Sequence, residues 1–417
     1  MMKSVSTVNK IIFTGMLSTF FLSSSYADEQ AESSALHSDL TVKPTFAQCQ
    51  DRFLEQAKQQ GFSDDINEII HQLTPIKRVL TLDKNQAEFA ESFAQYVNKR
   101  VSNYHIKNGK RLLNKHAELF NQLQAKYGIP PQYLVSFWGL ETVFGKHKGK
   151  MSVLNSIATL ACDNRRSEYF TSELFDLFSM IDEQRVAVEQ LQGSWAGAMG
   201  HMQFMPSAYR KYAIDGDGDG KVDVWQSEAD AITTAANYLN KIGWNKQERW
   251  GREVKLPENF DFSAIAYDKR YPLSIFKTLG VKQSNGKALP DYDIHAELVL
   301  PNGHQGHAFL VYRNFDVIMK WNLSKNYALS VGILADKLVG GKGVSSVKAA
   351  KPLQFSRVQM QQLQTKLNEL GFETGKPDGI WGPNSRKAIR AFQLEKNLIA
   401  DGFPNQEVFN SLGLTQS

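Results

Sequence analysis

A run of small, polar and basic residues divides the 417-residue chain into two unequal parts. Residues 341–353 combine glycine, serine, lysine and one proline, a composition typical of a linker between folded units. In residues 354–417, apolar side chains recur at the spacing of two helices around a loop rich in glycine and proline. The sequence therefore predicts a small helical module behind a larger domain. The alternative is a tail that folds back onto the main domain.

The larger part has mainly helical patterning. Apolar spacing predicts helices over residues 111–127, 229–241 and 325–338, and Pro130-Pro131 predicts the start of a further one. Between residues 250 and 315, short β-prone runs bounded by proline, glycine and asparagine predict strands. The expected fold class is therefore α+β, mostly helical, with a small strand-containing region.

The first 27 residues have the pattern of a secretory signal peptide. A short positively charged region precedes the apolar stretch Ile11 to Leu22, and the small residues Ser25 and Ala27 follow it. That stretch is well short of the roughly 20 residues that span a bilayer. We expect cleavage near Ala27, then a loose segment over residues 28–45, and an exported protein with no membrane anchor.

Charge and cysteine content exclude some classes of protein. The 48 basic and 43 acidic residues are too evenly balanced for an electrostatic nucleic-acid binder. Two cysteines are too few for a cysteine-rich zinc module. In an oxidising compartment, Cys49 and Cys162 could form a disulfide. The alternative is two separate buried thiols.

Glu141 is the first candidate for chemistry. A helix that starts at Pro130-Pro131 would carry Phe137, Trp138 and Phe144 three or four positions from Glu141. A carboxyl desolvated by such neighbours has a raised pKa, which a general acid needs near neutral pH. No second carboxylate stands at helical spacing from it. The alternative is a glutamate that faces solvent or bonds nearby backbone.

A glycine-rich segment over residues 192–209 is the second candidate. Its glycines allow close approach of the backbone, and Ser194 and Gln203 are neutral hydrogen-bonding groups among aromatic residues. This combination suits carbohydrate better than phosphate, since neither phosphate-loop pattern is present. The alternative is that the glycines only allow helices to pack.

Residues 215–230 resemble a calcium-binding EF-hand loop. Asp215, Asp217 and Asp219 stand at positions one, three and five, and a glycine stands at position six. The Lys221 carbonyl would be a further ligand. Position twelve is glutamine, so a later acid, Glu228 or Asp230, would have to complete the site. The alternative is a solvated acidic turn.

These motifs, taken together, resemble the B-type lytic murein transglycosylases. The resemblance covers about residues 46–340. Its motifs are Glu141-Thr-x-x-Gly145, Gly193-Ser-x-Ala-Gly-Ala-Met-Gly200, Gln203-Phe-Met-Pro-Ser207, the loop at Asp215, and Trp321-Asn322-x-Ser324-x-x-Tyr327-Ala328. Residues 354–417, with Asp378-Gly-Ile-Trp-Gly382, resemble a three-helix peptidoglycan-binding domain. The resemblance implies a lysozyme-like catalytic domain over 46–340 followed by a wall-binding module.

The resemblance also implies an activity. Enzymes of this family cleave the β-1,4 bond between N-acetylmuramic acid (NAM) and N-acetylglucosamine (NAG) in peptidoglycan and leave a 1,6-anhydro-muramyl end. Glu141 would serve as the single catalytic residue, first as acid and then as base, whereas the ordinary glycosidase scheme needs two carboxylates. The alternatives are a hydrolysing muramidase and a non-catalytic wall-binding scaffold.

Further roles follow by motif. The residues that the resemblance places at the substrate are Ser194, Gln203, Asn322, Tyr327, Tyr238, Tyr96, Arg165 and Arg166. For the two arginines, the alternative is plain surface charge. The implied calcium ligands are Asp215, Asp217, Asp219, the Lys221 carbonyl and Asp230, with no organic cofactor.

The expected partners and compartment follow from the same resemblance. The partner is the peptidoglycan glycan strand, with cell-wall synthesis proteins as further candidates. We expect a monomer in the periplasm, with no nucleic-acid partner. Many members of the family are lipoproteins, but this chain lacks their lipidated cysteine.

Overall fold

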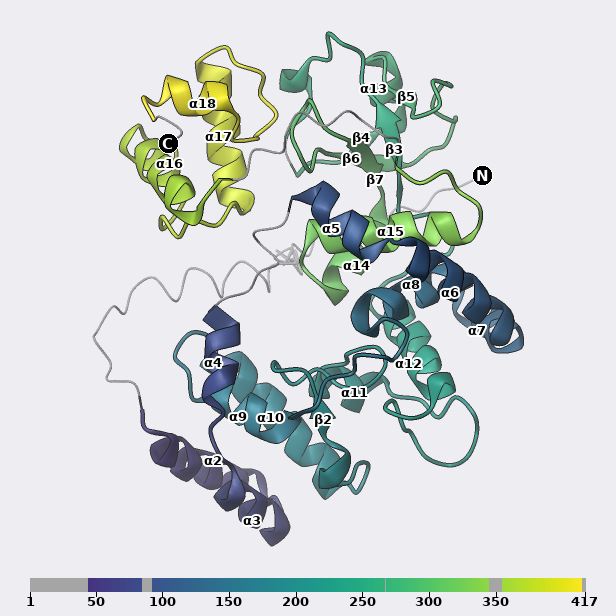
Figure 1. Cartoon of the computed structure of the whole chain (residues 1–417), viewed down its shortest axis with the longest axis vertical. Coiled ribbons are helices and arrows are strands. Elements are labelled where there is room, and N and C mark those ends of the chain that lie inside the picture. The colour runs from purple at the N-terminus through teal and green to yellow at the C-terminus, as the bar shows by residue number, and fades with distance from the viewer. Residues whose placement is uncertain (1–43, 85–91, 267, 345–354, 415–417) are drawn as a thin grey trace, which may run out of the picture. The chain divides into compact units, whose positions relative to one another are not determined.

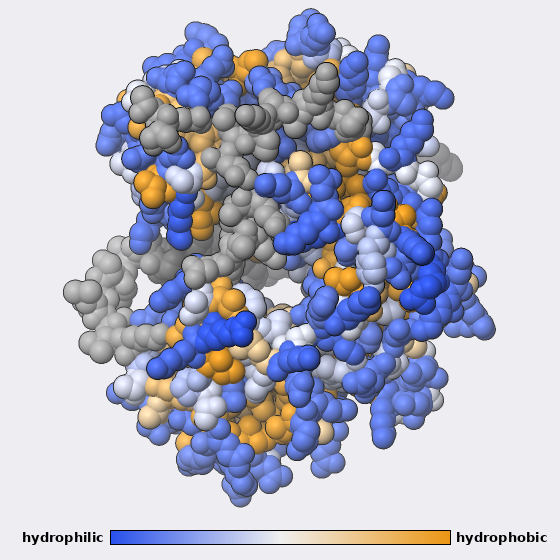
Figure 2. Space-filling model, in the orientation of Figure 1, coloured by the Kyte–Doolittle hydropathy of each residue, from blue (hydrophilic) through white to orange (hydrophobic). Residues whose placement is uncertain are grey.

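The structure is a computed structural model that describes residues 44–84, 92–266, 268–344 and 355–414 (Figure 1). The predicted signal peptide, nearly all of the loose segment after it and most of the predicted linker lie outside the described residues. Within the described ranges, no helix is long and apolar enough to cross a membrane. Figure 2 shows a face covered mainly by hydrophilic side chains, with hydrophobic ones in scattered patches.

One group of helices surrounds a disulfide bond. Its members are α2 (Phe46–Gln60), α3 (Asp64–Gln72), α4 (Lys77–Lys84), α9 (Val153–Ala161) and α10 (Ser167–Asp182). Helix α9 packs against α4 and α10, and α3 packs against α2 and α10. Their apolar faces are fully buried at positions such as Phe53, Ile157 and Phe178.

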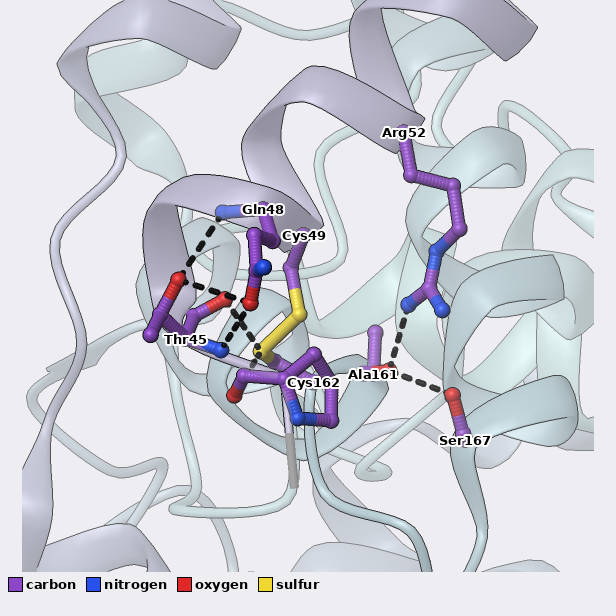
Figure 3. The surroundings of a disulfide bond; sticks show 8 residues. Thr45, Gln48, Cys49, Arg52, Ala161, Cys162 and Ser167 are labelled. Carbon is purple, nitrogen blue, oxygen red and sulfur yellow. Dashed lines mark hydrogen bonds between the residues drawn. A yellow bond between two sulfur atoms is a disulfide. The ribbon is translucent and has the colours of Figure 1, made fainter. Parts of the chain in front are cut away.

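The disulfide joins Cys49 on α2 to Cys162, which follows the last residue of α9 (Figure 3). The two sulfur atoms are 2.00 Å apart, and the cysteines are 113 residues apart in sequence. Thr45 caps α2 next to this bond, and Arg52 donates to the carbonyl oxygen of Ala161 at 3.4 Å. Closing a loop of this length restricts the unfolded chain and is worth about 3–5 kcal/mol of stability.

A second group of helices forms the centre of the larger domain. Its members are α5 (Phe93–Arg100), α6 (Asn103–Lys115), α7 (Ala117–Tyr127), α8 (Pro131–Thr142), α11 (Pro206–Tyr212), α12 (Glu228–Lys241), α14 (Arg313–Trp321) and α15 (Lys325–Leu338). Helix α8 is buried along nearly all its length and contacts α6, α7, α12 and α15. It starts with a proline in its first turn, as predicted.

The prediction of one continuous helix over residues 111–127 is wrong, because the structure has two helices there. The chain leaves helical geometry at His116, which ends α6 and precedes α7. His116 Nε2 lies 2.7 Å from Glu228 Oε2 on α12. The apolar spacing continues through this break because both helices bury the same side. Leu112 and Phe120 are both fully buried.

A five-stranded antiparallel sheet supplies the strand-containing region. Its strands are β3 (Gly251–Lys255), β4 (Tyr271–Pro272), β5 (Lys282–Gln283), β6 (His295–Val299) and β7 (Ala308–Val311), in the order β4-β6-β7-β3-β5. With α13 (Leu273–Thr278), the sheet encloses its own apolar core, which includes Phe276 and Leu310. A short pair, β1 (Met151–Ser152) and β2 (Gln192–Gly193), lies apart from it.

The C-terminal residues form three helices: α16 (Arg357–Glu369), α17 (Pro383–Glu395) and α18 (Gln406–Ser411). Leu363, Ile389 and Phe392 fill a separate apolar core, as their spacing predicts. Leu370 continues the apolar spacing of the first of these helices, but it is half exposed because α16 ends before it. Gly371 then adopts φ +86°, a conformation that favours glycine.

Candidate active site

The candidate catalytic carboxyl stands in the last turn of α8. The helix ends at Thr142, and Val143 and Phe144 both adopt left-handed conformations, with φ of 52° and 60°. The Thr142 hydroxyl donates to the carbonyl oxygen of His201 at 2.7 Å and accepts from the N–H of Gly145 at 2.8 Å. Phe144 therefore lies beyond the helix, although it was predicted to lie on it. The Glu141 side chain is half-buried.

Two hydrogen bonds hold the Glu141 side chain. The Trp321 indole Nε1 donates to Glu141 Oε1 at 3.0 Å, and the Tyr327 hydroxyl donates to the same oxygen at 2.5 Å. Trp321 is the last residue of α14, and Tyr327 lies in the first turn of α15, whose N-cap is Ser324. Three helices therefore meet at this carboxyl.

Aromatic rings surround these contacts. The Trp321 ring centroid lies 4.5 Å from that of Phe137, 5.1 Å from that of Tyr238 and 5.6 Å from that of Phe204. Tyr238 in turn packs at 4.9 Å against Tyr212. Such rings suit the apolar faces of sugars. Trp321 was not predicted as a site residue, although it stands beside Asn322 in a quoted motif.

The glycine-rich segment forms a tight loop whose polar side chains bond backbone. The Ser194 hydroxyl accepts from the N–H of Ala198 at 3.0 Å. The Gln203 amide nitrogen donates to the carbonyl oxygens of Lys148 (3.1 Å) and Gly200 (3.0 Å). A Cβ on Gly200 would lie 2.4 Å from the carbonyl oxygen of Val224, so close packing requires glycine here. Ser194 and Gln203 are both half-buried.

The other predicted substrate residues have different surroundings. Asn322 Oδ1 accepts from the N–H of Ser324 at 3.0 Å, at the junction of α14 and α15. Tyr96 is 1% exposed, and the Arg100 guanidinium lies 3.5 Å above its ring. Tyr96 therefore packs within the core, whereas the resemblance placed it at the substrate.

The predicted arginine pair shares one carboxylate. Arg165 and Arg166 both form ion pairs with Asp83 on α4, and Arg165 also donates to the Asp83 carbonyl oxygen at 2.8 Å. Asp83 is buried, whereas the two arginine side chains are 53% and 41% exposed. Asp83 was not predicted, since it lies about 80 residues earlier in a segment without a motif. The guanidiniums are therefore held in place and still reach solvent.

Glu173 is a further buried carboxyl and was not predicted as a site residue. It accepts from the N–H of Ser207 at 2.9 Å and from the Ser207 hydroxyl at 2.8 Å, at the start of α11. The Tyr169 hydroxyl also bonds it. Burial raises the pKa of Glu173, and the hydrogen bonds from Ser207 oppose that shift. These contacts show Glu173 fastening α10 to α11.

His201 links the catalytic helix to the glycine-rich loop. Trp138 Nε1 donates to His201 Nδ1 at 3.1 Å, and the His201 backbone accepts from Thr142. Burial, together with nearby Lys148, lowers the pKa of His201 to about 4. The imidazole is therefore neutral near pH 7 and can accept the indole N–H.

The acidic loop brings three of its carboxylates together. Oxygen atoms of Asp215, Asp217 and Asp219 lie within 4.8 Å of one another. Hydrogen bonds from the backbone N–H groups of Gly220 and Gly218 lower the pKa of Asp215. Carboxylate oxygens at this spacing are the donor set that Ca²⁺ takes in proteins, so the residues fit that ion.

The fifth predicted ligand, Asp230, bonds the backbone of the loop in this structure. It lies outside the acidic cluster and is 1% exposed. Its two carboxylate oxygens accept from the N–H groups of Gly216 (2.8 Å) and Asp223 (2.6 Å). Asp230 therefore connects the two ends of the loop through these hydrogen bonds. Lys221, predicted to offer its carbonyl, is exposed, and its N–H donates to Asp219 Oδ1 at 2.8 Å.

Comparisons with known proteins agree with this arrangement. The Transglycosylase SLT domain family matches residues 45–336, and the Putative peptidoglycan binding domain family matches residues 356–412. Membrane-bound lytic murein transglycosylase B of Escherichia coli strain K12 is 30% identical over 306 residues, which are 70% of this chain and 82% of that protein.

Solved structures are similar as well, among them those of SltB3 and Slt35. SltB3 of Pseudomonas aeruginosa, in complex with NAG-NAM-pentapeptide, has a TM-score of 0.83 at 37% identity and covers 88% of this chain and 99% of its own. The Escherichia coli lytic transglycosylase Slt35, in complex with calcium, has a TM-score of 0.61 at 29% identity. The match covers 70% of this chain and 92% of the Slt35 chain. The chain therefore belongs to the SLT-domain lytic murein transglycosylases, enzymes that cleave peptidoglycan, and carries a C-terminal domain of the peptidoglycan-binding family.

Proposed function

We propose that Glu141 is the single acid and base of this enzyme, and that cleavage between NAM and NAG leaves a 1,6-anhydro-muramyl end. The observation that carries the proposal is the orientation of the Glu141 carboxyl, which Trp321 and Tyr327 hold among aromatic rings. A fixed carboxyl beside surfaces that suit sugar rings can act on the oxygen between two sugars.

The reaction takes two proton transfers. Neutral Glu141 first gives its proton to the glycosidic oxygen while the bond from that oxygen to the muramyl C1 breaks, so NAG leaves as an alcohol. The Glu141 carboxylate then takes the proton of the muramyl 6-hydroxyl, whose oxygen forms the new bond to C1. Glu141 ends in its starting state, and no water enters the product.

The proposed substrate contacts keep their predicted roles. Asn322, Ser194 and Gln203 would hold the N-acetyl groups and the reacting sugar. Tyr238 and Tyr327 would line the cleft, whereas the buried Tyr96 would not reach the substrate. Arg165 and Arg166 would meet carboxylates of the stem peptide. Their exposed guanidiniums support this role, as does the pentapeptide-bearing ligand of SltB3.

The competing reaction is hydrolysis by a muramidase. Two-carboxylate glycosidases need a second carboxyl within about 5–10 Å of the acid, across the scissile bond. The hydrogen bonds that Glu173 accepts from Ser207 and Tyr169 favour a structural role for this buried carboxyl. Mass analysis of digested sacculi separates the two reactions, because an anhydro product is lighter by one water molecule. Hydrated ends alone would contradict the proposal.

We also propose a structural Ca²⁺ in the loop at Asp215. The fit of the three clustered carboxylates supports it, as does the calcium-bound structure of Slt35. The proposed ligands are Asp215, Asp217, Asp219, the Lys221 carbonyl and Asp230. A bound cation would offset the repulsion among these carboxylates and so stabilise the loop next to α12.

Calcium is expected to raise the melting temperature of the full chain by about 5 °C when its concentration is about 100 times its dissociation constant. The rise reflects binding to the folded state only. Asp217→Ala should remove it, because that variant lacks one of the clustered carboxylates. The control is Asp291→Ala, which removes an exposed carboxylate outside the loop and should keep the rise. An equal calcium response in wild type and Asp217→Ala would contradict the assignment.

We propose that the enzyme is exported, with residues 1–27 removed, and acts in the periplasm. The pattern of those residues supports export. The C-terminal helices would bind the wall and keep the catalytic domain close to its substrate, which raises the effective concentration of glycan at the cleft.

A further inference from the structure

Two hydrogen bonds to the Glu141 carboxyl share the same oxygen atom. Trp321 Nε1 and the Tyr327 hydroxyl both donate to Oε1, at 3.0 Å and 2.5 Å. The donors come from different helices, since α14 ends at Trp321 and α15 begins two residues before Tyr327. A contact made by two separate helices fixes the rotation of the carboxyl about its own axis.

The chemistry of the two donors makes the two oxygens different. An indole N–H can only donate, so Oε1 must act as an acceptor toward Trp321. The carbonyl oxygen of a carboxylic acid is a better acceptor than its hydroxyl oxygen. A neutral Glu141 that accepts twice at Oε1 therefore has its proton on Oε2.

The same contacts favour the state that follows proton donation. Once Glu141 has given up its proton, it is a carboxylate, and hydrogen bonds to a charged acceptor are stronger than those to a neutral one. The two donors are in place beforehand, so they stabilise the new charge without rearrangement. The rings of Phe137, Phe204 and Tyr238 pack against Trp321 and keep its indole in position to donate.

We infer that Trp321 is a positioning residue for the Glu141 carboxyl, and that with Tyr327 it makes Oε1 the accepting oxygen and Oε2 the oxygen that delivers the proton. This inference rests on the proposed function, in which Glu141 is the acid. It also gives Tyr327 a task at the carboxyl in addition to its predicted place in the cleft wall.

The test compares Trp321→Phe and Tyr327→Phe with wild type on a soluble glycan of NAG-NAM repeats. Each variant keeps a ring and loses one hydrogen-bond donor. A carboxylate that accepts fewer hydrogen bonds holds its proton to a higher pH, so the alkaline limb of kcat/KM should move up by roughly 0.5 to 1 pH unit. In addition, kcat should fall by about 10- to 100-fold with little change in KM, since the loss falls on the transition state.

The matched control is Trp250→Phe. Trp250 Nε1 donates to a different carboxylate, Asp336 Oδ2, at 3.2 Å, so this variant loses the same kind of hydrogen bond elsewhere in the same domain. Its alkaline limb should stay at the wild-type pH. If Trp321→Phe does not fold, Tyr327→Phe, which loses a single hydroxyl, provides the test alone.

The possible results separate two failures. If wild type releases anhydro ends and the alkaline limb is the same in wild type, Trp321→Phe and Tyr327→Phe, the positioning role is wrong and the proposed function stands. If wild type releases only hydrated ends, the proposed function itself is wrong. A limb that moves in the two variants but not in Trp250→Phe supports the inference.

Discussion

Replacing Glu141 with glutamine is expected to reduce release of glycan fragments from sacculi by about 10³-fold, the range that loss of a general acid and base produces. Glutamine has nearly the same shape, and its amide oxygen can still accept from Trp321 and Tyr327. The cleft should therefore keep its structure, while the proton needed by the leaving oxygen is absent. Release measured by mass analysis, with sacculus binding measured by co-sedimentation, separates these two effects.

Glu173→Gln is the matched control for that experiment. Glu173 is also a buried carboxyl of the catalytic region, but its hydrogen bonds go to Ser207 and Tyr169. The variant should still produce anhydro ends, and Glu141→Gln should still bind sacculi through the C-terminal domain. Unchanged release by Glu141→Gln, or loss of all release in Glu173→Gln alone, would contradict the single-carboxyl scheme.

Acidification is expected to destabilise the catalytic domain through His201. Burial holds the pKa of His201 at about 4 in the folded state, against 6.5 for an unperturbed histidine. Between these values the unfolded chain binds a proton that the folded chain does not, so the free energy of unfolding falls as pH falls. The contribution is complete above pH 6.5 and is lost by about pH 4, a change of about 2–3 kcal/mol.

The measurement is urea unfolding of wild type and His201→Asn at several pH values between 4.5 and 7.5. The asparagine oxygen can accept from Trp138 as the imidazole does, but the side chain does not titrate. The variant should therefore be less sensitive to pH over this range, by about 2 kcal/mol. Parallel pH curves for the two proteins would show that His201 is not the group responsible.

Apolar spacing and capping residues in the sequence predicted helices and strands that form from neighbouring residues. The helix predicted over residues 325–338 is α15, with the same bounds, because Ser324 caps it and its apolar face is continuous. The predicted strand runs are β6 and β7. The break at His116 was missed because α6 and α7 bury residues of one continuous periodic pattern, and the contact with Glu228 is more than 100 residues away in sequence.

Patterns in the sequence could not predict which residues form hydrogen bonds or ion pairs with the site residues. Trp321 and Tyr327 are 180 and 186 residues from Glu141, so spacing in the sequence carries no sign that they meet. The same holds for Asp83, which pairs with both arginines. Asp230 remains a predicted ligand, and its place in the sequence gave no sign that its carboxylate also accepts from the backbone at both ends of the loop.

The central claim is that the muramyl 6-hydroxyl, not water, attacks C1. Digestion of sacculi in water enriched with oxygen-18, followed by mass analysis of the released ends, tests it most directly. We expect 1,6-anhydro-muramyl ends that carry no oxygen-18, since both oxygens on C1 come from the substrate. Reducing ends that contain one oxygen-18 atom would show that water entered at C1 and would contradict it.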